Sequence, residues 1–356
     1  MRISGLDFLR GIAIILVIFR HGGSDNWLTF IGWAGVDLFF VLSGFLVSGL
    51  VFKEYKERES VDIKRFLIRR AFKIYPPFYF FILVSIVLFY GSTGGFYTTS
   101  QILTEVFYLQ SYREGMWLHT WSLAVEEHFY LALAIVIFLC LKGKIIDNVT
   151  IMRNGLIACL ILTFLLRLQI ASQNSDKQIF SFTQTHLRLD GILVGVLASY
   201  LYYFTSFYKT FLINKFVNLG AGFLLMSPLL WSAGGSYFMN TVGLTTVNIG
   251  FGIVVLFSLK GWSLRFLPLN KILKGPFKLI QFIGIHSYSI YLWHLMSDNI
   301  ITVLNINLKD SFWLNVVITL MVGISMSYAI ERPILKLRDK WYKKPIIQAN
   351  TEAASI

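Results

Sequence analysis

Two polar residues in the first apolar segment, Arg10 and His21, are of types that do chemistry. They lie 11 residues apart, which at about 100° per residue puts them within roughly 20° of one helical face. An imidazole can act as a general acid, a general base or a nucleophile, and a guanidinium stabilises negative charge. The pair therefore favours catalysis. A hydrogen-bonded core histidine, or an ion pair between Arg10 and Glu331, would explain the same residues.

The segment WSLAVEEHFYL, residues 121 to 131, adds carboxylates to this set. Ser122, Glu126 and Tyr130 share one helical face because they are spaced by four residues. We expect Glu126 to lie at the depth of His21, where a carboxylate can orient an imidazole and stabilise its cation. A water-exposed funnel would be enough to explain the neighbouring Glu127.

Basic residues cluster before the rigid pair Pro76 and Pro77. Lys73 follows Arg69 by four residues and Arg70 by three, so all three could bind one polyanion such as a phosphate group. Basic residues beside a membrane also set topology or contact anionic lipid. Two adjacent arginines before two prolines favour a specific phosphate site.

Three more polar residues are candidates for the same site: Asp37, Arg188 and His294. Helix packing with a satisfied carboxylate would explain Asp37 equally well, and Asp190 could simply neutralise Arg188. No two histidines have HxxxH spacing on one helix, and both cysteines lie in apolar runs. We therefore expect no metal site.

These residues must be positioned by helices that cross a membrane, because 56% of the chain is hydrophobic and only 14% is charged. A net charge of +13 would suggest nucleic acid as the partner of a soluble protein, but the charges lie between apolar segments, and no nucleic-acid partner is expected. Segments of about 20 apolar residues span a bilayer. Ten are predicted near residues 6–23, 32–52, 71–91, 121–141, 151–170, 187–205, 216–232, 244–259, 279–301 and 312–335.

The loops between these segments are basic on one side only. With the N-terminus inside, the internal loops and tail hold 24 Lys and Arg residues and the external loops hold 3. Cytoplasmic loops carry such an excess, so we predict an all-α, polytopic bundle of about ten helices with both termini cytoplasmic. Residues 1–345 would form one transmembrane domain and residues 346–356 a disordered tail. The external loop at about 92–120 could order a substrate.

Several motifs, in order along nearly the whole chain, resemble those of the membrane-bound acyltransferase-3 family. LDFLRGIAIILVIFRH at 6–21 resembles its opening Arg-x10-His motif, and GVDLFFVLSGFLV at 35–47 resembles its second-helix signature. IRRAFKIYPPFY at 68–79 is similar to its RRxxRIxP stretch, although Lys73 keeps the charge of an arginine without its bidentate geometry. The series is completed by WSLAVEEHFYL, by HLRLDGILVG at 186–195, by SYSIYLWH at 287–294 and by Glu331, Arg332 and Pro333.

The resemblance implies an integral membrane O-acyltransferase of the bacterial inner membrane, without the fused esterase-like domain of some members. It implies a cytoplasmic acyl-CoA donor, most simply acetyl-CoA, and an extracytoplasmic hydroxyl acceptor on a cell-surface polysaccharide or lipid-linked sugar. His21, Glu126 and Arg10 would be catalytic, and the basic cluster would bind the donor.

A transporter or flippase of lipid-linked sugars is the alternative function, since it also needs charges inside its bundle. Dependence on acyl-CoA distinguishes the two. A sensory or scaffold protein is a weaker third reading, because it has no need of a catalytic face. Apart from donor, acceptor and membrane lipids, no partner is predicted, and the oligomeric state is left open.

Overall fold

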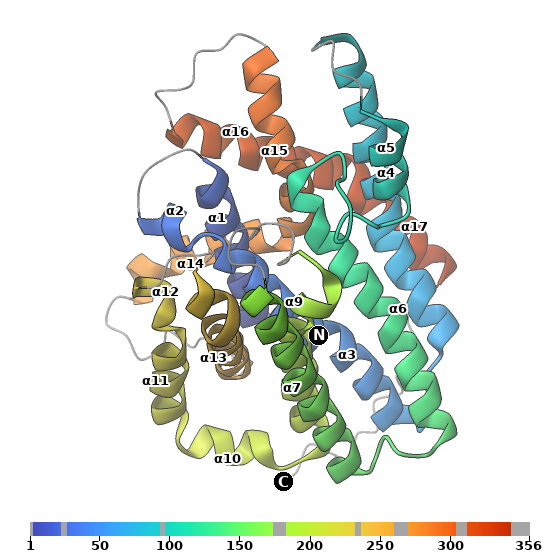
Figure 1. Ribbon diagram of the computed structural model, residues 1–356, viewed down its shortest axis with the longest axis vertical. Coiled ribbons are helices and arrows are strands. Elements are labelled where there is room, and N and C mark those ends of the chain that lie inside the picture. Colours follow the sequence, from blue (N-terminus) through green and yellow to red (C-terminus); the bar gives the residue numbers. More distant parts are fainter. Residues whose placement is uncertain are drawn as a thin grey trace.

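The computed structural model describes residues 3–22, 27–92, 97–173, 183–231, 236–259, 270–303 and 312–342. Within these ranges the chain is all-helical without a β-strand, which confirms the predicted fold class (Figure 1). The predicted tail at 346–356 lies outside the described residues. The helices are α1 (Ser4–His21), α2 (Trp27–Ile31), α3 (Ala34–Arg58), α4 (Ile63–Ser92), α5 (Thr99–Val106), η1 (Leu118–Thr120), α6 (Trp121–Lys142), α7 (Val149–Gln173), α9 (Thr185–Phe204), α10 (Phe207–Ile213), α11 (Lys215–Met226), α12 (Pro228–Trp231), η2 (Met239–Gly243), α13 (Leu244–Ser258), α14 (Asn270–Ile285), α15 (Ser287–Val303), α16 (Phe312–Met326), η4 (Ser327–Glu331) and α17 (Arg332–Trp341).

All ten predicted segments fall on helices, but fewer are long and apolar enough to cross a membrane. Seven helical segments in the described part of the chain pass this test. An eighth passes if α10 and the α11–α12 segment, which are bent by 95°, count as one span. The predicted number of ten spans is therefore not reached by length and composition.

The other two differences have local causes. Helix α1 carries four ionisable side chains, Asp7, Arg10, Arg20 and His21, within 18 residues, so it is less apolar than a simple span. The predicted segment at 279–301 is divided at His286, where α14 ends and α15 begins.

Glycines let the central helices approach closely. Helix α1 packs on α14, and a Cβ atom added at Gly284 would overlap the Asp7 main-chain oxygen. Helix α3 packs on α9 in the same way, because a Cβ at Gly44 would overlap the Ile192 oxygen. Small residues at such crossings let backbones touch. These contacts fix α1 and α3, which carry Arg10 and Ser43, against the rest of the bundle.

One end of the bundle collects basic residues. Helices α3 and α6 end there and α7 begins there, on the lower side of the view in Figure 1. The residues at these helix ends include Lys56, Arg58, Lys142, Lys144 and Arg153. This arrangement is the spatial counterpart of the loop asymmetry in the sequence.

Candidate active site

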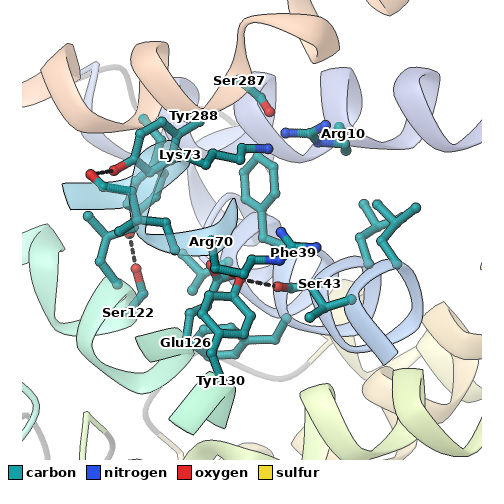
Figure 2. A pocket seen from close by; sticks show the side chains of 18 residues that line it. Arg10, Phe39, Ser43, Arg70, Lys73, Ser122, Glu126, Tyr130, Ser287 and Tyr288 are labelled. Atoms are coloured by element: carbon teal, nitrogen blue, oxygen red, sulfur yellow. Dashed lines mark hydrogen bonds between the residues drawn. The ribbon is translucent and has the colours of Figure 1, made fainter. Parts of the chain in front are cut away.

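A cavity of about 110 Å³ lies between α1, α3, α4, α6 and α15. We call it the large cavity (Figure 2). Its polar lining residues are Arg10, Ser43, Arg70, Lys73, Ser122, Glu126, Tyr130, Ser287, Tyr288 and Tyr291. Apolar side chains, among them Phe39, Phe40 and Leu46, complete the wall. A mostly apolar cavity with a few convergent polar groups is the usual form of a ligand site.

Three cations and one carboxylate meet in this cavity. Arg10 comes from α1, Arg70 and Lys73 from α4, and Glu126 from α6. Figure 2 shows the Lys73 amine and the Arg10 guanidinium reaching toward one region of the cavity, with Ser287 beside them. If all four groups are ionised, the formal charge of the lining is +2, counted as three positive groups and one negative group. Such a lining suits a ligand with negative charge.

Hydrogen bonds connect the Glu126 carboxylate to Tyr130 of its own helix α6 and, through Tyr130, to Ser43 of α3. The Tyr130 hydroxyl donates to Oε2 of Glu126 at 2.9 Å and lies 2.7 Å from the Ser43 hydroxyl. The Arg70 guanidinium lies over the Tyr130 ring, 5.5 Å from its centroid. The predicted shared face of Ser122, Glu126 and Tyr130 is confirmed, since all three line the large cavity.

A layer of hydroxyl groups closes one side of the large cavity. The Ser122 and Tyr291 hydroxyls are 2.6 Å apart, and Tyr291 donates to the main-chain oxygen of His119 at 2.9 Å. The His119 ring packs on Tyr291 and on His294, with centroid separations of 5.6 and 4.7 Å. Histidines therefore lie directly behind this wall.

His21 lies beyond the wall, in a separate small cavity of about 10 Å³. Its ring centroid is 5.1 Å from that of His294, which lines the same small cavity. The two cavities share no lining residue. Across the described ranges, no hydrogen bond joins His21 to Glu126, so the expected pairing of these two side chains is absent. Nor does any group of three or more His, Cys, Asp or Glu residues there have the arrangement of a metal site.

The basic cluster of α4 is divided by the structure. Arg70 and Lys73 line the large cavity, whereas Arg69 does not. Arg69 donates instead to Asp339 at 3.0 Å and to the main-chain oxygen of Tyr342, and thereby holds the C-terminal helix α17 against α4. The three basic residues therefore do not converge on one point, because Arg69 and Arg70 leave the helix about 100° apart.

Two buried ion pairs lie outside both cavities. Arg188 donates to Asp37 at 2.7 Å, and Arg167 donates to Asp190 at 2.8 Å and also to Thr245. Asp190 therefore neutralises Arg167 and not Arg188, contrary to expectation. Arg167 is fully buried and was not among the residues predicted from the sequence. The signal was present, since a lone arginine in the apolar run ILTFLLRLQI is as costly as Arg10.

Two other expectations concern acidic residues. Glu331 accepts hydrogen bonds from Ser289 at 2.6 Å and Ser327 at 3.2 Å, and in the part of the chain that is described it has no ion pair with Arg10. Glu127 is buried and accepts a hydrogen bond from the Tyr75 hydroxyl, so it does not face a water-exposed funnel.

Glu105, in α5, was not singled out from the sequence. It is buried, accepts from Thr120 at 2.7 Å, and burial raises the pKa of its carboxyl to about 7.

The arrangement provides the parts of a group-transfer site. The large cavity offers positive charge and a carboxylate, and the small cavity offers imidazoles that can carry protons. A wall of Ser122 and Tyr291 lies between them. An anionic donor and a hydroxyl acceptor could thus be held on separate sides of one partition.

Comparisons with known proteins give consistent results. A protein of Staphylococcus aureus strain COL, provisionally named an O-acetyltransferase, is 29% identical over 321 residues, and a protein of strain MSSA476 with the same kind of name is 29% identical over 319 residues. O-acetyltransferase OatA of strain NCTC 8325 is 26% identical over 325 residues. Each alignment covers 82% of this chain and 50% of the relative, so the chain spans about half the length of the curated relatives it matches.

No solved structure gives a significant match to the chain. The family model described as "Acyltransferase domain" matches residues 3–332, which include both cavities and nearly the whole described bundle. The chain therefore belongs to the acyltransferase-3 family of membrane O-acyltransferases.

Proposed function

We propose that this protein is a membrane O-acetyltransferase that moves an acetyl group from acetyl-CoA to a hydroxyl group of an extracytoplasmic carbohydrate. Membership of the family and the names of the relatives support acyl transfer to oxygen. The observation that carries the donor assignment is the meeting of Arg10, Arg70 and Lys73 in one cavity with Glu126. A sugar substrate without charge would give no reason to bury three cations together.

The size of the large cavity indicates which part of the donor it receives. Its 110 Å³ is small beside the roughly 300–1,000 Å³ of common ligand pockets. It would therefore hold the thioester end of the donor, while the nucleotide stays outside, toward the basic end of the bundle. The thioester arm itself is uncharged, so Arg70 and Lys73 would bind the diphosphate that joins this arm to the nucleotide, and Arg10 would stabilise charge that develops on the thioester oxygen.

His21 would serve the acceptor on the other side of the wall. In the reaction the acceptor oxygen attacks the acyl carbon, the C–S bond breaks, and the CoA sulfur leaves as a thiolate. The hydroxyl proton passes to His21 and returns to the sulfur, so the products are an ester and free CoA thiol. Glu126 would act on the donor side, where it already bonds Tyr130.

The positions of the basic helix ends and of His21 also support an orientation in the membrane. The basic helix ends would face the cytoplasm, where acetyl-CoA is made, and His21, at the opposite end of α1 from Ser4, would face outward. The host membrane would be the bacterial cytoplasmic membrane, as the Staphylococcus relatives suggest. The acceptor class, a cell-surface polysaccharide or lipid-linked sugar, is part of the proposal.

Labelled acetyl transfer tests this function. Cells that express the wild-type protein, or no protein, are fed radiolabelled acetate, and ester-linked label is counted in their purified surface glycans. We expect label with the wild-type protein and background label with His21→Ala. Normal labelling by His21→Ala, confirmed at equal protein level in the membrane, would contradict the role of His21. Sugar translocation by proteoliposomes that lack CoA, with no acetyl ester formed, would favour a transporter.

A further inference from the structure

The ring of His294 is fixed in one protonation form by its own helix. Its Nδ1 lies 2.6 Å from the main-chain oxygen of Tyr291. A carbonyl oxygen only accepts hydrogen bonds, so the proton is on Nδ1. In a neutral imidazole the other nitrogen, Nε2, then carries a lone pair and no proton. This Nε2 atom is buried and has no hydrogen-bond partner among the described residues, so α15 presents a bare base inside the bundle.

His119 shows the same feature with the opposite nitrogen. Its Nε2 lies 3.2 Å from the main-chain oxygen of Leu292, the residue after Tyr291, and so carries the proton. Its Nδ1 is buried and has no partner in the described part of the chain. Two adjacent imidazoles thus present acceptors, and neither offers a proton to the other. Buried acceptors without partners cost free energy and call for an explanation.

The bare nitrogen of His294 belongs to the ring that contacts His21. The two ring centroids are 5.1 Å apart and the rings are tilted by 53°, without a hydrogen bond between them. At this separation a rotation of the rings would bring facing nitrogens to about 2.8 Å, a hydrogen-bonding distance. Both rings line the small cavity. Its volume of about 10 Å³ is close to the room that a single water or hydroxyl oxygen occupies.

We propose that His294 is the positioning residue that accepts a proton from His21 during acyl transfer. Glu126, which was expected in this role from the sequence, lines the large cavity on the far side of the Ser122–Tyr291 wall. The inference rests on the proposed function, because it assigns a partner to the base of that same reaction. It adds that the carbonyl of Tyr291 sets the tautomer on which the partnership depends.

Protons are conserved along the proposed path from acceptor to thiolate. The acceptor hydroxyl gives its proton to one nitrogen of His21 while its oxygen attacks the acyl carbon. The proton on the other nitrogen of His21 moves to Nε2 of His294, which becomes an imidazolium and still donates from Nδ1 to Tyr291. As the C–S bond breaks, the electron pair leaves on sulfur. The extra proton then returns through His21 to the thiolate, and both rings regain their starting forms.

Two substitutions separate proton transfer from hydrogen bonding. His294→Asn keeps an amide N–H near the position of Nδ1, so the bond to Tyr291 survives while the acceptor at Nε2 is lost. His294→Gln places an amide oxygen near Nε2, which can accept a hydrogen bond but cannot take a proton. His128→Asn is the matched control, because His128 is a partly buried histidine on α6 that bonds Thr185 and lines neither cavity.

The assay measures CoA release from acetyl-CoA by purified protein in nanodiscs, with water and glycerol as hydroxyl acceptors. We expect both His294 variants to lower kcat by about 100-fold or more, with little change in the KM for acetyl-CoA or in the melting temperature. His128→Asn should match the wild type. A normal kcat in His294→Gln would mean that residue 294 only accepts a hydrogen bond and takes no proton. A normal kcat in His294→Asn would mean that only its hydrogen bond to Tyr291 matters. Either result overturns the proposal.

A second measurement does not depend on turnover. Nitrogen-15 NMR of histidine-labelled protein distinguishes protonated from bare ring nitrogens, and the His294 signals are those missing from His294→Asn. A neutral ring protonated at Nδ1 is expected, and protonation at Nε2 would overturn the inference. If the wild type neither binds acetyl-CoA nor releases CoA, the proposed function fails, whereas loss of turnover in His21→Ala but not in the His294 variants defeats only this inference.

Discussion

Replacing Arg70 tests whether the large cavity binds the donor. Arg70 is one of three cations in its lining, so Arg70→Ala lowers the formal charge there from +2 to +1. It also removes the guanidinium that lies over the Tyr130 ring. A hydrogen bond to a charged group contributes about 1.5–3 kcal/mol. Since about 1.4 kcal/mol is a tenfold change in affinity, acetyl-CoA should bind roughly 10- to 150-fold more weakly.

Thermal stability in the presence of ligand gives the measurement. At acetyl-CoA equal to about 100 times its Kd, the wild type should gain ~2.7 kcal/mol of unfolding free energy. A 100-fold weaker variant at the same concentration should gain only ~0.4 kcal/mol. Arg70→Lys should fall between these values, because lysine keeps the charge and loses the planar fork.

Arg153→Ala is the control for charge alone. Arg153 is exposed on α7 at the same basic end of the bundle, away from the large cavity. Its removal should leave the gain from acetyl-CoA close to that of the wild type. Equal stabilisation of Arg70→Ala and Arg153→Ala would show that acetyl-CoA does not contact the cavity lining, and the donor assignment would be refuted.

Three further expectations concern stability. Arg167→Met leaves Asp190 as an uncompensated buried charge and should cost about 3–5 kcal/mol, whereas adding Asp190→Asn should restore part of that loss in denaturant unfolding. Gly284→Ala meets a main-chain oxygen and should cost about 1–3 kcal/mol, while Gly275→Ala, which meets nothing, should not lower the melting temperature. Glu105 has a pKa near 7 in the folded protein, above its usual 4.5. Folding therefore favours its protonated form, and stability should fall by about 3 kcal/mol as pH rises from 4.5 to 7. A Glu105→Gln protein that keeps this full slope would contradict that cause.

Hydrophobic runs predicted the helices well, because an apolar stretch of this length has few other stable forms in a bilayer. They predicted the number of spans less well. The ionisable side chains of α1 are visible in the sequence, but counting spans by the length of a run ignores them. The break in the helix path at His286 depends on the neighbours that surround the segment, and a single run carries no information about neighbours.

The same lack of information about neighbouring helices explains which parts of the site were predicted correctly. Residue spacing placed Ser122, Glu126 and Tyr130 on one face correctly, because all three belong to one helix. Estimated depth placed His21 beside Glu126, but Glu126 lines the large cavity together with Arg10. Since Arg10 and His21 share one face of α1, the estimate of depth was wrong: His21 lies about three turns beyond Arg10 and lines the small cavity, next to a residue of α15.

Arg69 illustrates the point within a single helix. Spacing of three or four residues made it a plausible partner for Lys73, yet α17 packs on α4 and supplies Asp339 to its guanidinium. The competing partner lies 270 positions further along the chain. No local pattern could have predicted this contact, which arises only when the C-terminal helix docks.

The hydrogen-bonded hydroxyls of Ser122 and Tyr291 also bear on the energy supply of a cell. A file of water molecules through a bundle would conduct protons down the membrane gradient and waste respiration or ATP. Here the large and the small cavity have no lining residue in common, and the Ser122–Tyr291 hydroxyl pair lies between them. In the proposed reaction only the proton of the acceptor reaches the thiolate, so an acyl group would pass this hydroxyl pair without a continuous file of water across the membrane.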